Sequence, residues 1–141
     1  MKTAQKLFQE NYTYGDYLTW PEGERWELID GEAYDMSPAP TLNHQDILGD
    51  LYIQFASFFQ NKKCKVYTAP VDVLFPDNDQ QDEKKVRNVV QPDLVVICDR
   101  KKLNEKNVKG APDLVIEVLS PSTASKDVIK KRRLYETHGV K

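Results

Sequence analysis

The stretch Pro112-Asp-Leu-Val-Ile-Glu-Val-Leu119 decides the fold, because it is an aliphatic run interrupted by one internal carboxylate. Such runs, rich in Val, Ile and Leu without clean alternation, are typical of strands covered on both faces. Segments 65–75 and 89–98 are two further strand candidates. Segment 77–88 is polar and is predicted to be a mobile surface loop, and segment 100–110 is too short and polar to be assigned a core helix.

A β-hairpin is predicted close to the N-terminus. Asp30-Gly31 is the strongest short turn signal, and short strand-like runs flank it within residues 25–36. Pro38 and Pro40 then interrupt the chain. Residues 1–40 are therefore expected to form a helix and hairpin extension, followed by a core of residues 41–141.

Two helices are predicted around the strands. Thr41 or Asn43 can cap the first helix, which should end near Asn61. Its apolar positions follow the helical period of 3.6 residues and are Ile47, Leu48, Leu51, Phe55, Phe58 and Phe59. The second helix covers residues 126–138. Helices and strands in this order indicate an α/β (α+β) fold, with a central mixed β-sheet flanked by helices.

Length and composition favour one soluble domain. A chain of 141 residues with 40% hydrophobic and 30% charged residues is expected to fold as a single globular domain over 1–141. No apolar run approaches the roughly 18 residues that span a bilayer, and the N-terminus lacks the apolar core of a secretory signal. Cys64 and Cys98 cannot form a disulfide framework and lack the spacing of a zinc site. We therefore expect a cytoplasmic protein without membrane contact.

The net charge of −2 hides an uneven distribution along the chain. Residues 1–60 carry three basic and ten acidic residues, whereas residues 61–141 carry seventeen basic and twelve acidic residues. A basic half is compatible with a surface that faces a polyanion, because phosphate contacts depend on local fields. Solvated lysines give the same pattern, so the charge distribution alone does not decide between the two interpretations.

Glu117 is the carboxylate that interrupts the aliphatic run. An ionised carboxylate in a buried strand is unfavourable unless it is paired, protonated or bound to a metal. One interpretation is a buried salt bridge with a lysine or arginine. The other is a catalytic or metal-binding role, because ionisable groups in apolar strands are candidates for functional sites.

Asp93 is the best partner for Glu117, because it leads into the neighbouring aliphatic strand. Asp113 stands in a similar Pro-Asp context and competes for this role, but it lies on the same strand as Glu117, about 13 Å away at roughly 3.3 Å per residue. Asp72 on the first strand is a possible third carboxylate. Carboxylate oxygens suit Mg²⁺ or Mn²⁺ better than zinc.

The second helix offers a positive charge to accompany such a metal. Its helical phase turns Lys131 inward, and Asp127, Lys131 and Tyr135 form one ridge at a spacing of four residues. An ordinary lysine that extends along the apolar surface to solvent is the alternative. His44 extends the apolar stripe of the first helix, where a structural histidine is the favoured interpretation.

Six ordered motifs then carry a resemblance to a known family. They are WELIDGE at 26–32, MSPAP at 36–40 followed by His44, Ala-Pro-Val-Asp72, Gln-Pro-Asp93-Leu-Val-Val, Ala-Pro-Asp113-Leu-Val-Ile-Glu117, and the ridge that ends at Tyr135. From about residue 12 to residue 140 the chain resembles the Uma2 family of restriction endonucleases, a branch of the PD-(D/E)XK nuclease superfamily. The resemblance implies a restriction-endonuclease-like core around one metal-dependent site that hydrolyses phosphodiester bonds of DNA.

The resemblance also implies roles for individual residues. Asp93, Glu117 and the backbone carbonyl of Val118 would hold Mg²⁺ or Mn²⁺, and Lys131 would orient the water or stabilise charge on phosphorus. Leu119 stands where the superfamily pattern has its lysine, and Lys131 on the following helix takes that place.

Two further expectations follow from the resemblance. Relatives continue with another strand after the second helix, so a C-terminally truncated member is expected, with an open sheet edge that promotes a homo-oligomer, most simply a dimer. The leading function is a metal-dependent endonuclease acting on DNA. The alternative is a catalytically inactive module on the same fold that binds nucleic acid or another partner.

Overall fold

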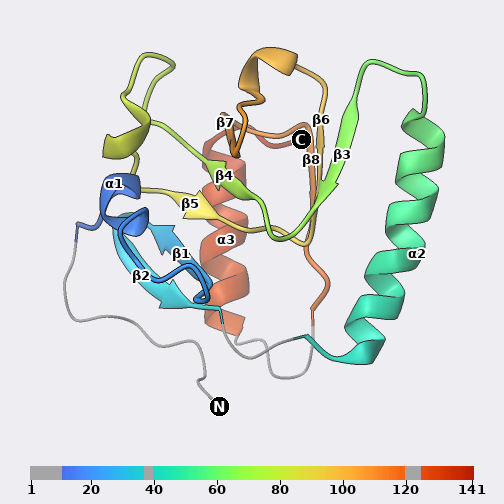
Figure 1. Ribbon diagram of the computed structural model, residues 1–141, viewed down its shortest axis with the longest axis horizontal. Helices are drawn as coiled ribbons and strands as arrows, with labels where there is room; N and C mark the ends of the chain where they lie inside the picture. The colour runs from blue at the N-terminus through green and yellow to red at the C-terminus, as the bar shows by residue number, and fades with distance from the viewer. Residues whose placement is uncertain (1–10, 37–39, 120–124) are drawn as a thin grey trace.

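The computed structural model describes residues 11–36, 40–119 and 125–141. Its strands form two sheets, with α2 (Leu42–Phe59) beside the smaller sheet and α3 (Ser125–Thr137) behind the larger one (Figure 1). The predicted α+β fold, a mixed sheet flanked by helices, is confirmed. Among the described helices, none combines the length and the hydropathy that a membrane crossing requires.

The larger sheet has the strand order β2-β1-β5-β4-β7 and is mixed, because β4 and β7 are parallel while its other pairs are antiparallel. Its strands are β1 (Trp26–Ile29), β2 (Glu32–Asp35), β4 (Asp72–Leu74), β5 (Val89–Val90) and β7 (Asn107–Lys109). The smaller sheet is antiparallel, with the order β3-β6-β8. Its strands are β3 (Lys65–Thr68), β6 (Leu94–Ile97) and β8 (Leu114–Ile116).

The N-terminal hairpin is confirmed at its predicted turn. Asp30 and Gly31 connect β1 to β2 with φ angles of 52° and 79°. Positive φ at both central residues is what a type I′ turn requires, and the twist of this turn matches that of the two strands. The hairpin places Glu27 of β1 in the interior of the molecule.

Two predicted strands are each divided between the two sheets. Segment 65–75 forms β3 in the smaller sheet and β4 in the larger one, and segment 89–98 forms β5 and then β6. The breaks fall at Pro70 and Pro92, which have no N–H to donate to a strand ladder. Each of these two segments therefore crosses from one sheet to the other, and Asp93 lies at the crossing between β5 and β6.

Both polar segments contain more structure than the sequence predicts. Segment 77–88 includes the short 3₁₀ helix Glu83–Lys85, and its last residues are not a mobile surface loop, because Val86 is fully buried and Asn88 accepts a hydrogen bond from the N–H of Asp30. Segment 100–110 begins with a 3₁₀ helix and ends in β7, which extends the larger sheet. Strand pairing with β4 outweighs the low strand propensity of this segment.

The helices agree with the predicted positions within a few residues. Thr41 caps α2 by accepting a hydrogen bond from the N–H of His44, and α2 ends at Phe59. The apolar stripe is narrower than predicted, because Ile47 and Phe58 are exposed and no residue of α2 is fully buried. A four-residue helix, α1 (Tyr14–Tyr17), precedes the hairpin.

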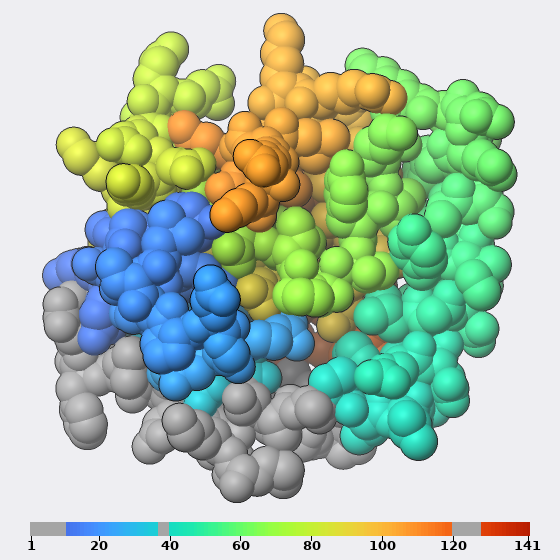
Figure 2. Space-filling view, viewed as in Figure 1, coloured from blue at the N-terminus to red at the C-terminus, as the bar shows by residue number. Residues whose placement is uncertain are grey.

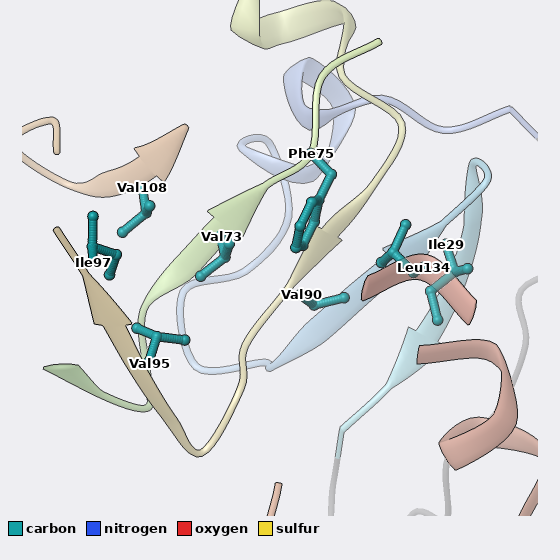
Figure 3. Close-up of a cluster of buried hydrophobic side chains, with 8 residues drawn as sticks. All are labelled: Ile29, Val73, Phe75, Val90, Val95, Ile97, Val108 and Leu134. Carbon is teal, nitrogen blue, oxygen red and sulfur yellow. The ribbon is translucent and has the colours of Figure 1, made fainter. Parts of the chain in front are cut away.

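Two apolar clusters cover opposite faces of the larger sheet. The first, shown in Figure 3, brings together side chains from the strands and from α3 and contains Ile29, Val73, Phe75, Val90, Val95, Ile97, Val108 and Leu134. The second contains Tyr14, Trp26, Leu28, Ala33, Leu74, Val86 and Val89. Alternation along β4 explains this division, since successive strand residues point to opposite faces. In Figure 2 the blue residues that follow position 10 lie against the yellow-green residues of segment 77–88.

Cys64 and Cys98 form a disulfide, although no disulfide framework was expected from two cysteines. Lys65 of β3 pairs with Ile97 of β6, so the residues just outside this pair face each other across the two strands. The sequence could not show this register. The disulfide links the residue just before β3 to the residue just after β6.

Candidate active site

The register of β6 and β8 brings two carboxylates together. Leu94 pairs with Ile116, so Asp93 and Glu117, one residue further along, face each other on neighbouring strands. The N–H of Asp93 donates to Oε1 of Glu117 at 3.1 Å, and the N–H of Val118 donates to Oδ2 of Asp93 at 2.7 Å. Each carboxylate is thus oriented by the backbone of the other strand.

Lys131 of α3 reaches Glu117, but not Asp93, from the helix behind the larger sheet. It is only 7% exposed, and its Nζ lies 2.6 Å from Oε2 of Glu117 and 2.7 Å from Oε2 of Glu27. Lys130, its neighbour, is exposed, as the predicted helical phase requires. Burial alone would lower the pKa of Lys131, but the two carboxylates raise it well above its ordinary value. The ammonium is therefore charged at neutral pH.

Glu27 belongs to this group, and the sequence analysis did not select it. It is 2% exposed on β1 and accepts hydrogen bonds at Oε2 from Nζ of Lys131 and from the N–H of Gln91, both at 2.7 Å. The signal was present, because Glu27 interrupts the apolar strand Trp26–Ile29 just as Glu117 interrupts its own. The same criterion applied to the hairpin would have found it.

The ionisation of Glu117 is coupled to its neighbours. The pKa of Glu117 is raised from an ordinary value of 4.5 to about 7, chiefly by burial; Lys131 opposes this rise, and the carboxylates of Glu27 and Asp93 add to it. The contact with Lys131 confirms the salt-bridge interpretation of Glu117, and its catalytic or metal-binding role stays a prediction. This arrangement is typical of sites that bind a cation or transfer a proton.

His44 lies beside Asp93 and is therefore more than a structural residue of the apolar stripe of α2. Its Nε2 is 3.3 Å from Oδ1 of Asp93, and its Nδ1 is buried with no hydrogen-bond partner among the described residues. Tyr135, one helical turn after Lys131, likewise has a buried hydroxyl without such a partner. Asp127 lies on α3, but its side chain is outside the described part of the structure.

Two candidate carboxylates are engaged elsewhere. Asp72 accepts hydrogen bonds from the hydroxyls of Tyr14 and Tyr17 and from the side-chain amide of Gln91, and none from the site lysine. Asp113 is exposed and accepts a hydrogen bond from the N–H of Cys98, at the other end of β6 from Asp93. Strand length separates Asp113 from the site, and the two tyrosines hold Asp72 in a network of its own.

The donor set fits a hard cation that takes few ligands from the protein and completes its coordination with water. Among the described residues, no three His, Cys, Asp or Glu side chains are grouped as a metal site. Mg²⁺, however, commonly takes only one or two protein carboxylates and keeps several waters. Each oxygen of Asp93 and Glu117 has one assigned neighbour and retains lone-pair capacity. The pair therefore suits Mg²⁺ or Mn²⁺, while the carbonyl of Val118 as a third ligand stays a prediction.

The two strand carboxylates, the helix lysine and the mixed sheet define a restriction-endonuclease-like protein. A solved structure with this fold is that of "a putative nuclease belonging to DUF820" from Anabaena variabilis, with a TM-score of 0.70 and 22% identity over 91% of this chain and 69% of that one. The chain belongs to the Uma2 family, described as "Putative restriction endonuclease", which matches residues 14–141.

A curated relative is also longer than this chain. An uncharacterized protein of Synechocystis sp. is 30% identical over 122 residues, which are 85% of this chain and 60% of that protein. The chain thus spans less than two thirds of the relative that it matches.

Proposed function

We propose that this protein is a metal-dependent endonuclease that hydrolyses phosphodiester bonds of DNA. The observation that carries the proposal is the convergence of Asp93, Glu117 and Lys131 from three separate elements, with Nζ of Lys131 2.6 Å from Glu117. Membership of the Uma2 family supports a nuclease-like activity. The acidic pair with a neighbouring lysine also resembles the PD-(D/E)XK pattern, except that Leu119 stands at the lysine position and α3 supplies the lysine.

Asp93 and Glu117 are the proposed ligands of Mg²⁺ or Mn²⁺, with the carbonyl of Val118 beside them. When bound, such an ion lowers the pKa of a coordinated water and neutralises charge on the phosphate. His44 holds Oδ1 of Asp93, and the N–H of Val118 holds Oδ2, so this carboxylate is oriented before any ligand arrives.

Lys131 is the proposed electrostatic group of the site. Its ammonium is charged and buried, and a fixed positive charge in a site of low dielectric stabilises negative charge that develops on phosphorus. Glu27 keeps the ammonium close to Glu117 and is the proposed positioning group. The basic half of the chain is compatible with DNA as the polyanion, and self-association into a homo-oligomer remains a prediction that sedimentation can test.

The test compares two aspartates in the same Pro-Asp context. The wild-type protein should nick or linearise plasmid DNA with Mg²⁺ or Mn²⁺ and be inactive in EDTA. Asp93→Asn should lower the cleavage rate by about 100-fold or more, because it removes one anionic ligand. Asp113→Asn, the same chemical change outside the site, should stay within about twofold of wild type. Equal loss in both variants, or cleavage in EDTA, would contradict the proposal.

A second candidate function is an inactive module that binds nucleic acid or another partner. Leu119 at the position of the superfamily lysine favours it, as does the engagement of Lys131 by two carboxylates. This module would bind DNA equally well with and without divalent ions and would cleave under neither condition. Gel-shift titrations run beside the cleavage assay separate the two functions.

A further inference from the structure

Gln91 occupies the bend between β5 and β6, two residues before Asp93, and is 9% exposed. Its backbone N–H donates to Oε2 of Glu27 at 2.7 Å. The same oxygen accepts the hydrogen bond from Nζ of Lys131, also at 2.7 Å. The position of the Gln91 backbone N–H therefore determines where the carboxylate of Glu27 can lie. Glu27 in turn contacts the buried ammonium of Lys131.

The side chain of Gln91 is held by three further hydrogen bonds. Its Oε1 accepts a hydrogen bond from Nε of Arg25 at 2.8 Å. Its Nε2 donates to the hydroxyl of Tyr17 at 2.9 Å and to Oδ1 of Asp72 at 3.0 Å. Both amide donors and one acceptor are thus used, and only one orientation of the amide satisfies all three bonds.

The partners of Gln91 are themselves fixed. Tyr17 donates to Oδ1 of Asp72 at 2.7 Å, and Tyr14 donates to Oδ2 at 3.1 Å. Burial and the charge of Asp72 raise the pKa of Tyr17 well above its ordinary value, so the phenol remains a donor. A continuous chain of hydrogen bonds therefore runs from α1 through Asp72, Gln91 and Glu27 to Lys131.

We propose that Gln91 is a positioning residue of the site, which holds Glu27 and thereby the Lys131 ammonium in place. Its side chain does so by fixing the bend against Asp72 and Tyr17. The inference rests on the proposed endonuclease function for its effect on rate, and on the hydrogen-bond geometry alone for its effect on the lysine. It gives Asp72 a role in positioning instead of metal binding.

Gln91→Met is the informative variant, because methionine keeps the side-chain length and loses all three side-chain hydrogen bonds. We expect kcat for DNA cleavage to fall about 10-fold or more, since small displacements of a catalytic group have large effects on rate. KM should stay within about twofold, because no substrate contact is removed. Far-UV circular dichroism checks that the variant is folded.

Tyr17→Phe and Tyr14→Phe form a matched pair on α1. Both lose a hydroxyl that donates to Asp72, but only Tyr17 also accepts a hydrogen bond from Gln91. Tyr17→Phe should lower kcat several-fold, and Tyr14→Phe, which keeps the contact between Tyr17 and Gln91, should lower it less. A wild-type kcat in Gln91→Met, or equal effects of the two tyrosine variants, would overturn the inference.

A measurement without substrate separates this inference from the proposed function. The buried ammonium of Lys131 should give a protected ¹⁵N signal, identified by its absence in Lys131→Met. Gln91→Met should shift or broaden this signal, and Tyr14→Phe should change it less. If the wild type cleaves no DNA but the signal responds to Gln91→Met, the proposed function fails and the positioning role stands. If the wild type cleaves DNA and the signal is unchanged in Gln91→Met, the positioning role fails.

Discussion

Lys131 lies between two carboxylates that are each held by a backbone N–H, Glu27 by Gln91 and Glu117 by Asp93. The three charged groups are therefore fixed relative to the bend at Pro92. A phosphate that approaches this site meets a lysine whose charge is already balanced by carboxylates. A cation at Asp93 and Glu117 would change that balance, which links metal binding to the electrostatics of the lysine.

The first prediction concerns the loss of this lysine. Lys131→Met leaves Glu27 and Glu117 buried without their cation, and breaking a buried pair in this way costs about 3–5 kcal/mol of unfolding free energy. The additional change Glu27→Gln should recover part of the loss, because it removes one uncompensated charge. Urea denaturation of the single and double variants measures both effects. Lys130→Met, the exposed neighbour, should cost under about 1 kcal/mol; equal losses at 130 and 131 would contradict the buried pairing.

A second prediction concerns pH. The pKa of Glu117 is raised to about 7 by burial, with Lys131 lowering it and Glu27 and Asp93 raising it, whereas the unfolded chain titrates near 4.5. Between these values the folded state binds more protons than the unfolded state, so its stability falls as pH rises. The loss should be on the order of 1–3 kcal/mol and level off above pH 7. The raised pKa of Lys131 adds no slope in this window, because the lysine is charged in both states.

The measurement is the free energy of unfolding of wild type and Glu117→Gln in metal-free buffer from pH 4.5 to 8. Glutamine does not titrate, so the difference between the two proteins should change across the window. A constant difference would show that Glu117 has an ordinary pKa.

At this scale the sequence predicted some residues and missed others for physical reasons. The helical phase predicted correctly that Lys131 points inward, because the rotation from one residue to the next is a local property of an α-helix. Glu27 was missed although its strand context matched that of Glu117, since its partner lies 104 residues away and only the fold joins them. Asp72 was grouped with the strand carboxylates, but its tyrosine partners come from α1, a helix that the sequence analysis expected within residues 1–40 without giving its position.

At the scale of elements, the strands show how proline shapes the site. The sequence predicted one strand in 65–75 and one in 89–98, with Pro92 as a strand start or bulge. It did not predict the change of sheet, because aliphatic content alone does not mark one. Pro70 and Pro92 interrupt the ladders, and the second interruption places Gln91 and Asp93 in one bend. The bend therefore carries two of the contacts that define the site. The β7 strand was not predicted, because its pairing with β4 is a long-range event.

A third prediction concerns the start of α2. Thr41 accepts a hydrogen bond from the N–H of His44 at 3.1 Å and so orders the helical turn that places His44 beside Asp93. Thr41→Ala should cost about 1 kcal/mol of stability, the usual loss when an N-cap is removed. Thr41→Ser keeps the hydroxyl and should retain most of the stability. Urea denaturation compares the variants, and an equal loss in both would show that the cap hydrogen bond contributes nothing.

At the scale of the whole molecule, the larger sheet connects the two apolar clusters. Val73 and Leu74 are adjacent on β4 yet belong to different clusters, and the same holds for Val90 and Val89 on β5. A loss of packing in one cluster therefore disturbs strands that the other cluster needs. The single domain expected from the sequence implies that both clusters unfold together.

The last prediction tests this coupling with the two tryptophans as reporters. Trp20 and Trp26 both lie in or against the second cluster, so tryptophan fluorescence follows that cluster alone. Phe75 is 1% exposed in the first cluster, on the other face of the sheet, and Phe75→Ala should cost about 3–5 kcal/mol through lost burial and a cavity. In one cooperative unit, this change lowers the urea midpoint seen by fluorescence as much as that seen by far-UV circular dichroism. Leu28→Ala, in the second cluster, provides the reciprocal control. If Phe75→Ala leaves the fluorescence transition unchanged while Leu28→Ala moves it, the two faces of the sheet unfold independently.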